Sequence, residues 1–210
     1  KQSKIAAHEF SHLDLDCILY DVEIKIAEML DVLNRGAEAK EFGKVANGRK
    51  DLINKYYLTD EGIYLDYNMT TGKHSEILSA VSLYPYTFGV SSDKEGALKT
   101  LKRLELKYGL SACEKRKDEV FFQWDYPCMW PAATCLAYMG LNDIGLKEDA
   151  TRIAGKYLSV VKNIFDETGR LWEKYDAETG KIAVTSEYET MPMMGWTAAV
   201  YRYFAESEKL

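Results

Sequence analysis

Apolar residues recur at helical spacing along most of this chain, and this periodicity limits the folds available to it. Between Leu13 and Leu33 they return every three or four residues, which is the pattern of an amphipathic helix. The same pattern predicts helices over five further ranges: Glu38–Tyr57, Asp93–Leu106, Pro131–Asn142, Lys147–Phe165 and Met194–Ala205. The segments between them leave room only for strands that are too short and too few for a central sheet. The sequence therefore predicts an all-α fold.

Two of the connecting segments look alike. Tyr64-Leu-Asp-Tyr67 is followed by Thr-Thr-Gly-Lys, and Trp172-Glu-Lys-Tyr-Asp176 is followed by Glu-Thr-Gly-Lys. Both are short runs of strand-forming residues next to a glycine-containing turn, so each predicts a β-hairpin. Helices that alternate with related hairpins indicate a repeating helical toroid whose loops gather at one end. No linker or low-complexity stretch interrupts the chain, so residues 1–210 are predicted to form a single domain.

Charge and cysteine content narrow the possible partners. The formal net charge of −6 argues against nucleic acid, which needs clustered excess Lys and Arg. No apolar run approaches the length of a membrane span, so a membrane partner is not expected either. The cysteines, at positions 17, 113, 128 and 135, include no CxxC pair, so zinc or redox motifs are not expected. Four reduced, mostly buried thiols predict a cytoplasmic location.

Three segments combine carboxylates with aromatic rings at the boundaries of predicted elements. They are Gln123-Trp-Asp-Tyr-Pro127 with Trp130, the 172–176 segment, and Ser186-Glu-Tyr-Glu189 leading to Gly195-Trp-Thr197. A glycosidase needs this mixture, because carboxylates protonate the leaving oxygen and activate water while rings pack on the sugar. Each segment alone also suits a packed loop with a capping acid. Together the three favour a sugar site.

These segments resemble the trehalase family of glycoside hydrolases and the related processing α-glucosidases. Gln123-Trp-Asp-Tyr-Pro127 with Trp130 is similar to the family's Gln-Trp-Asp-x-Pro-Asn-Gly-Trp signature. Residues 171–176 are similar to its Glu-Lys-Tyr-Asp segment, and residues 187–197 to its Glu-Tyr … Gly-Trp-Thr-Asn segment. Leu13-Asp-Leu-Asp-Cys-Ile-Leu-Tyr20 is similar to its Val-Asp-Leu-Asn-x-x-Leu-Tyr stretch. The likeness covers most of the chain, in the family's order.

The resemblance implies an (α/α)6 toroid, of which this chain matches the C-terminal half, and hydrolysis of an α-glucosidic bond, as in trehalose, with inversion. It implies that Glu187 is the base that activates water, and it requires no cofactor or metal. The residues that it implies for sugar binding are Gln123, Trp124, Asp125, Trp130, Glu173 and Trp196.

Two departures from the family pattern matter for substrate and mechanism. The glycine-rich run before the base is replaced by Lys181-Ile-Ala-Val-Thr-Ser186, which puts the preference for trehalose itself in question. The family's general acid lies in a Gly-Trp-Asp segment that this sequence lacks. Glu173 and Asp125 are the alternatives for this role, although nothing in their spacing requires it. The expected partners are therefore a small sugar substrate and the missing N-terminal part of the same enzyme.

Two other functions compete with this hypothesis. The chain could be a sugar-binding half-toroid that keeps the aromatic cleft without the acid. Alternatively, His8-Glu-Phe-Ser-His12 matches the H-E-x-x-H pattern of zinc peptidases, in which a helix presents both His rings to one zinc ion.

Overall fold

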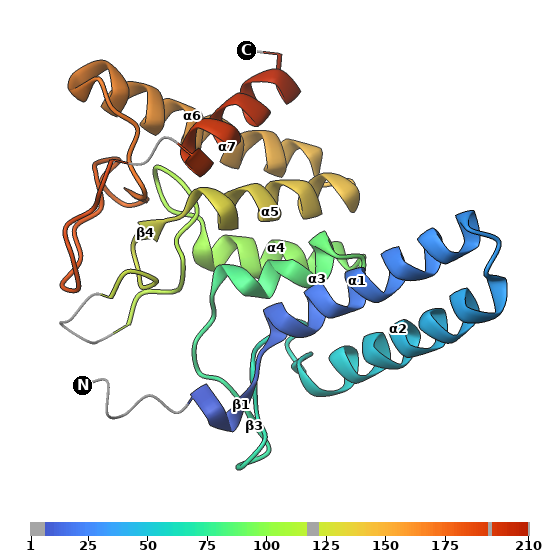
Figure 1. Cartoon of the computed structure of the whole chain (residues 1–210). Coiled ribbons are helices and arrows are strands. Elements are labelled where there is room, and N and C mark those ends of the chain that lie inside the picture. Colours follow the sequence, from blue (N-terminus) through green and yellow to red (C-terminus); the bar gives the residue numbers. More distant parts are fainter. Residues whose placement is uncertain (1–6, 117–121, 193–194, 210) are drawn as a thin grey trace.

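The computed structural model describes residues 7–116, 122–192 and 195–209, and Figure 1 shows that helices dominate it. The α-helices are α1 (Leu13–Val32), α2 (Gly36–Tyr56), α3 (Tyr84–Thr87), α4 (Lys94–Leu104), α5 (Pro131–Asp143), α6 (Lys147–Thr168) and α7 (Gly195–Ser207). The 3₁₀ turns of the described ranges are η2 (Ala7–Glu9), which precedes β1, and η3 (Ala80–Leu83), which leads into α3. The strands are β1 (Phe10–Ser11), β2 (Tyr67–Asn68), β3 (Lys73–His74), β4 (Cys128–Met129) and β5 (Tyr175–Asp176). The all-α prediction is confirmed.

The helices form two layers. One layer contains α1, η3 with α3, α5 and α7, which lie side by side in that order (Figure 1). The other layer contains α2 packed on α1, α4 packed on η3, and α6 packed on α5 and α7. Each connecting segment therefore carries the chain from one layer to the other. The segments that contain the strands β1 to β5 lie at one end of the molecule, and the α1–α2 turn lies at the opposite end (Figure 1).

Local sequence explains where the helices begin and end. The α6 helix buries a stripe that includes Ile153, Tyr157 and Val161, and it ends at Gly169, which takes the left-handed conformation at φ 68°. The α4 helix begins at an aspartate, Asp93, whose carboxylate accepts the N–H groups of the first turn. Pro85, which interrupts the apolar pattern, lies in the first turn of α3, where no N–H is needed.

The first helix is capped from a distance. Asp66, at the start of the first hairpin, accepts the backbone N–H of Leu13 at 2.9 Å.

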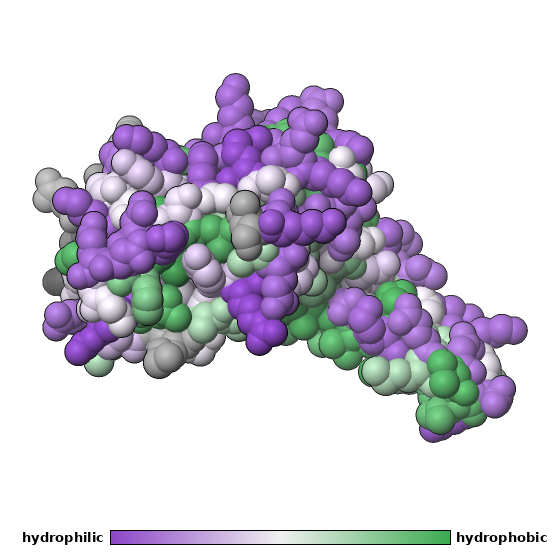
Figure 2. All heavy atoms as spheres, turned by 90° about the horizontal axis from the view of Figure 1, so that it is seen from above, coloured by the Kyte–Doolittle hydropathy of each residue, from purple (hydrophilic) through white to green (hydrophobic). Residues whose placement is uncertain are grey.

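The α1–α2 pair projects from the rest of the molecule (Figure 1), and Figure 2 shows hydrophobic surface on the projecting part. Val32, at the tip, is 83% exposed.

Two similar units recur within the chain. In the first unit (residues 10–74), β1 leads into α1 and α2, and β2 then returns antiparallel to β1, with Phe10 opposite Asn68. In the second unit (residues 128–182), β4 leads into α5 and α6, and β5 returns antiparallel to β4, with Cys128 opposite Asp176. The prediction of two related hairpins is therefore correct, and each hairpin also pairs with the strand that precedes its helices.

The turns of the two units have the same hydrogen bonds. Asn68 Oδ1 accepts the N–H groups two and three residues ahead, both at 2.9 Å, and Asp176 Oδ1 accepts the corresponding pair at 2.8 Å. Each turn ends at a glycine with positive φ, Gly72 at 68° and Gly180 at 71°. A short Asn or Asp side chain and a glycine are the residues that such a turn needs.

No helix in the described ranges is long and apolar enough to cross a bilayer. The final helix was predicted to begin at Met194, which lies outside the described residues; α7 is described from Gly195.

Candidate active site

A tight turn at residues 122–125 organises the site. Asp125 Oδ2 accepts the backbone N–H of Phe122 at 3.0 Å, and the N–H of Asp125 donates to the carbonyl of Phe122 at 3.0 Å. Asp125, predicted to bind sugar, thus has its carboxylate in the turn, where it fixes the path of the neighbouring Gln123 and Trp124.

Gln123 joins segments that lie far apart in the sequence. Its backbone N–H donates to Glu187 Oε2 at 2.7 Å, and its carbonyl accepts the indole N–H of Trp130, also at 2.7 Å. Glu187 itself is exposed to solvent. A carboxylate held by a backbone N–H in an open position can take a proton from a water molecule beside it.

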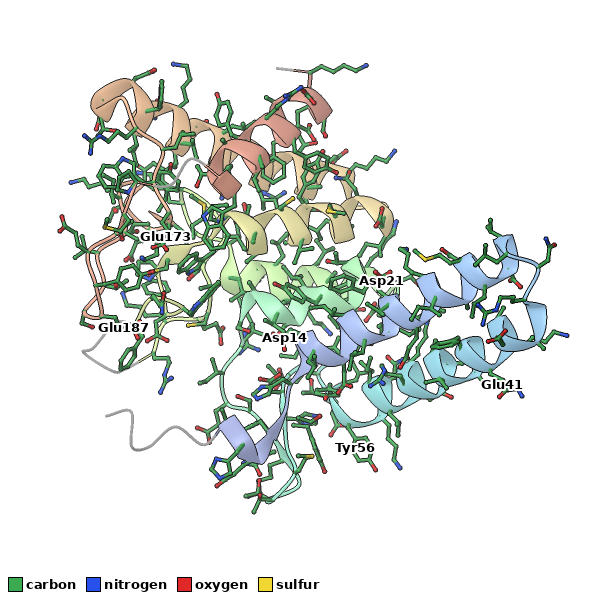
Figure 3. The ribbon with its side chains drawn as sticks, viewed as in Figure 1. Asp14, Asp21, Glu41, Tyr56, Glu173 and Glu187 are labelled. Atoms are coloured by element: carbon green, nitrogen blue, oxygen red, sulfur yellow. The ribbon has the colours of Figure 1, made fainter. Side chains whose placement is uncertain are left out.

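Glu173 belongs to the same cluster. Its Oε2 lies 2.9 Å from the ammonium of Lys174 and 2.7 Å from the hydroxyl of Tyr188. That hydroxyl lies 2.7 Å from Gln123 Oε1 as well, and the backbone N–H of Glu173 donates to the carbonyl of Met191 at 2.9 Å. Figure 3 shows Glu173 and Glu187 among the loops at the same end of the molecule.

The phenol of Tyr188 is a proton donor in this cluster. Burial and the hydrogen bond to Glu173 raise the pKa of Tyr188, and the ammonium of Lys174 offsets only part of that rise. Tyr188 therefore stays protonated at neutral pH.

Three indoles form the aromatic part of the site. The rings of Trp124 and Trp130 are stacked, with centroids 4.1 Å apart and planes 14° apart. Trp130 is 2% exposed, and the edge of Trp196 meets it at 5.4 Å. Trp124 is 53% exposed, so the stack has an accessible outer ring above a buried one. Trp130, predicted as a subsite ring, is the buried member of the pair, and Trp124, predicted with it, is the exposed one.

Trp196 lies at the start of α7 and is half-buried. Its indole nitrogen is buried, and among the described residues it has no hydrogen-bond partner. A buried N–H without a partner is unusual, and a ligand hydroxyl is one group that would satisfy it.

The structure thus brings together Gln123, Trp124, Trp130, Glu173, Glu187 and Trp196, all of which the sequence singled out. It also brings in Lys174 and Tyr188, which lie within the motifs of the sequence analysis but were given no role there. Nothing in the pattern distinguished them, because a lysine in a charged segment is normally solvated.

A trehalase family model matches residues 1–207. This chain belongs to the trehalase family. A periplasmic trehalase of Escherichia coli is 30% identical over 193 residues, which are 90% of this chain and 34% of that protein. The trehalase-family chain thus spans about a third of the length of the curated relatives that it matches.

Solved structures agree with the family assignment. The neutral trehalase of Saccharomyces cerevisiae superposes with a TM-score of 0.78 at 26% identity, over 94% of this chain and 38% of that one. A mannosylglycerate hydrolase of Thermus thermophilus superposes with a TM-score of 0.69 at 15% identity, over 92% of this chain and 45% of that one, which shows the fold alone. These likenesses confirm the helical toroid fold class that was predicted for a partial chain.

The predicted cytoplasmic location is contradicted by the curated relatives, which are periplasmic trehalases. The prediction rested on unpaired thiols, and Cys17, Cys113 and Cys128 are indeed buried and free. Burial raises the pKa of Cys113 to about 11 and that of Cys128 to about 12, so both thiols resist oxidation. Sheltered thiols of this kind carry no information about the compartment of this trehalase-family protein.

The zinc peptidase hypothesis fails on geometry. His8 lies in η2, and the chain then enters β1, so His8 and His12 do not share a helix face. The His12 ring instead lies 3.1 Å from the carbonyl of Ala7 and 3.5 Å from the Asp66 carboxylate. Within the described part of this trehalase-family chain, no group of three His, Cys, Asp or Glu side chains is placed to hold a metal ion.

Proposed function

We propose that this chain carries the base side of the active site of an inverting trehalose hydrolase, with Glu187 as the base. The observation that supports this role most directly is the 2.7 Å hydrogen bond from the Gln123 N–H to Glu187, which holds an exposed carboxylate beside the indole stack. Membership of the trehalase family supports the reaction class, and the relatives named as trehalases support the substrate.

The sugar binds against the outer face of Trp124, because a flat indole packs on the apolar face of a pyranose ring. The Tyr188 oxygen, whose own proton goes to Glu173, accepts a hydrogen bond from a sugar hydroxyl, and the indole N–H of Trp196 donates one. Glu173 lies 2.7 Å from the Tyr188 hydroxyl and so fixes its orientation.

In the proposed reaction Glu187 takes a proton from a water molecule as the water oxygen attacks the anomeric carbon. The bond to the bridging oxygen breaks, and a carboxylic acid on the opposite side gives that oxygen a proton. Inverting enzymes keep these two carboxyl groups roughly 6.5–9.5 Å apart to admit the water. Asp125 does not suit the role of acid, because its carboxylate closes the 122–125 turn. We propose that the acid comes from a part of the trehalase-family catalytic domain that this chain does not match, since the chain matches only 34% of the periplasmic relative.

Proton NMR of trehalose tests the proposal when it is run on a complete trehalase-family catalytic domain that contains this chain, because the proposed acid lies outside the chain. Inversion releases one α- and one β-glucose, so equal amounts appear before mutarotation, whereas retention releases α-glucose alone. Glu187→Gln is expected to lower the rate by about 100-fold or more, which is the usual contribution of a general base.

Glu189→Gln is the matched control, because Glu189 is an exposed carboxylate two residues away. An unchanged rate in Glu187→Gln would refute the assignment of the base. The chain on its own is expected to bind trehalose without cleaving it, as the sugar-binding half-toroid that the sequence left open would do. Cleavage by the chain alone would contradict the proposal that the acid lies outside it.

A further inference from the structure

Lys174 has the most unusual environment of any charged side chain at the site. Its side chain is 0% exposed, although lysines are almost never fully buried unless they are paired. The ammonium lies 2.9 Å from Glu173 Oε2, 4.1 Å from the ring centroid of Tyr188 and 5.1 Å from that of Trp130. One carboxylate and two aromatic faces thus compensate the buried charge.

The first unit has a residue at the position that corresponds to Lys174, and there its role is purely structural. Asp66 precedes Tyr67-Asn68 as Lys174 precedes Tyr175-Asp176, and Asp66 caps α1 by accepting the N–H of Leu13. In the second unit the helix begins with Pro131, which has no N–H to donate. The capping role is therefore absent there, and the side chain at this position is a cation that faces the candidate active site.

We propose that Lys174 is a positioning residue of the sugar site, acting through Glu173 and Tyr188. This inference rests on the proposed function. The ammonium balances the charge of Glu173, so that this carboxylate can hold the Tyr188 hydroxyl at 2.7 Å. Tyr188 in turn lies 2.7 Å from the Gln123 side chain, and the backbone N–H of Gln123 holds Glu187. Lys174 thereby fixes the two segments that carry the base and the outer tryptophan.

Trehalose affinity, measured by isothermal titration calorimetry in a Glu187→Gln background so that the sugar is not consumed, tests this role. Lys174→Met is expected to weaken binding at least 10-fold, and Lys174→Arg, which keeps the charge, to recover part of that loss. Lys181→Met is the matched control, since Lys181 is an exposed lysine of the same hairpin, and it is expected to bind as the background does. Circular dichroism at the same temperature establishes that each variant is folded.

A double-mutant cycle separates positioning from a purely structural role. If Lys174 acts through Glu173, then Glu173→Gln with Lys174→Met binds within twofold of Glu173→Gln alone. The double variant removes both charges and so leaves no buried unpaired carboxylate, and it decides the question if Lys174→Met alone does not fold.

Unchanged affinity in folded Lys174→Met would overturn the proposal while leaving the proposed function intact, and so would independent, multiplying losses in the cycle. A background chain that does not bind trehalose would overturn the proposed function, and the positioning role would fall with it.

Discussion

The first and second units have the same backbone arrangement but differ in the side chains at equivalent positions. Each unit has a two-residue strand, a helix pair and a returning hairpin with the same turn. In the first unit, the Asp66 carboxylate lies 3.5 Å from the His12 ring and accepts the backbone N–H of Leu13, which caps the start of α1. In the second unit the same two places hold Trp130, the buried ring of the indole stack, and Lys174, whose ammonium lies 5.1 Å from the centroid of that ring.

This difference separates scaffold from chemistry. The turn residues and the strand register are kept in both units, because the fold depends on them. The residues that face the loop end are free to change, since the helix pairs hold the backbone regardless. A carbohydrate site can then be built on one copy while the other copy remains a structural support.

Alanine at the two turn glycines is expected to give the largest difference between the units. Both glycines have positive φ, which costs an alanine about 1 kcal/mol. A Cβ on Gly72 meets only the Tyr67 hydroxyl at 3.5 Å, whereas a Cβ on Gly180 would lie 2.8 Å from the Tyr108 ring. Gly180→Ala should therefore lose about 3 kcal/mol and Gly72→Ala about 1 kcal/mol in urea unfolding. Equal losses would show that the Tyr108 ring moves aside without cost.

Removing the ion pairs that join the end of α4 to the second unit should have the next largest effect. Glu105, which ends α4, accepts hydrogen bonds from Arg152 of α6 at 2.8 and 2.9 Å and lies 2.6 Å from the ammonium of Lys156. Burial alone would raise the pKa of Glu105, but its bonds to Arg152 and Lys156 hold it below the ordinary value. Glu105→Gln should cost about 2 kcal/mol at pH 7.

The pH dependence of that loss follows from the lowered pKa. A carboxyl group whose pKa falls on folding stabilises the protein above its unfolded pKa, and this contribution disappears as the pH falls through the folded value. The difference in unfolding free energy between wild type and Glu105→Gln should therefore shrink once the pH drops below about 4.5. Denaturant unfolding at neutral and acidic pH measures it; a difference independent of pH would contradict the ionic origin.

Asp66→Ala should have the smallest effect on stability, and it tests whether the first unit takes part in sugar binding. Loss of the carboxylate that caps α1 should cost about 1 kcal/mol. The melting temperature should fall by about 2–4 °C, and trehalose affinity should stay unchanged. Weakened sugar binding in this variant would mean that the first unit also contributes to the site.

Helical periodicity was enough to predict the long helices, whose ends lie within about three residues of the predicted ones. Periodicity did not predict α3, because Pro85 reads as an interruption until it is placed in a first turn. Helical spacing also does not fix which side chains of α4 are buried: Leu98 is 39% exposed, because Ala97 and Leu101 take the buried side.

Long-range pairing was beyond the sequence. The strand β5 pairs with β4, whose residues lie more than forty positions earlier, and no local pattern indicates such a partner. The same limit applies to the site. The motifs identified its carboxylates and indoles, but the burial of Lys174 depends on Trp130 and Tyr188 arriving from two other segments.

The stacked indoles have a practical consequence. Trp124 and Trp130 are close and parallel enough for their electronic transitions to couple, and three of the four tryptophans of the chain lie in this one cluster. The tryptophan signals of the near-ultraviolet circular dichroism and of the fluorescence therefore come mainly from the place where the sugar is expected to bind. The unlabelled protein carries its own optical reporter, and occupancy of the site could be followed in real time without any added dye.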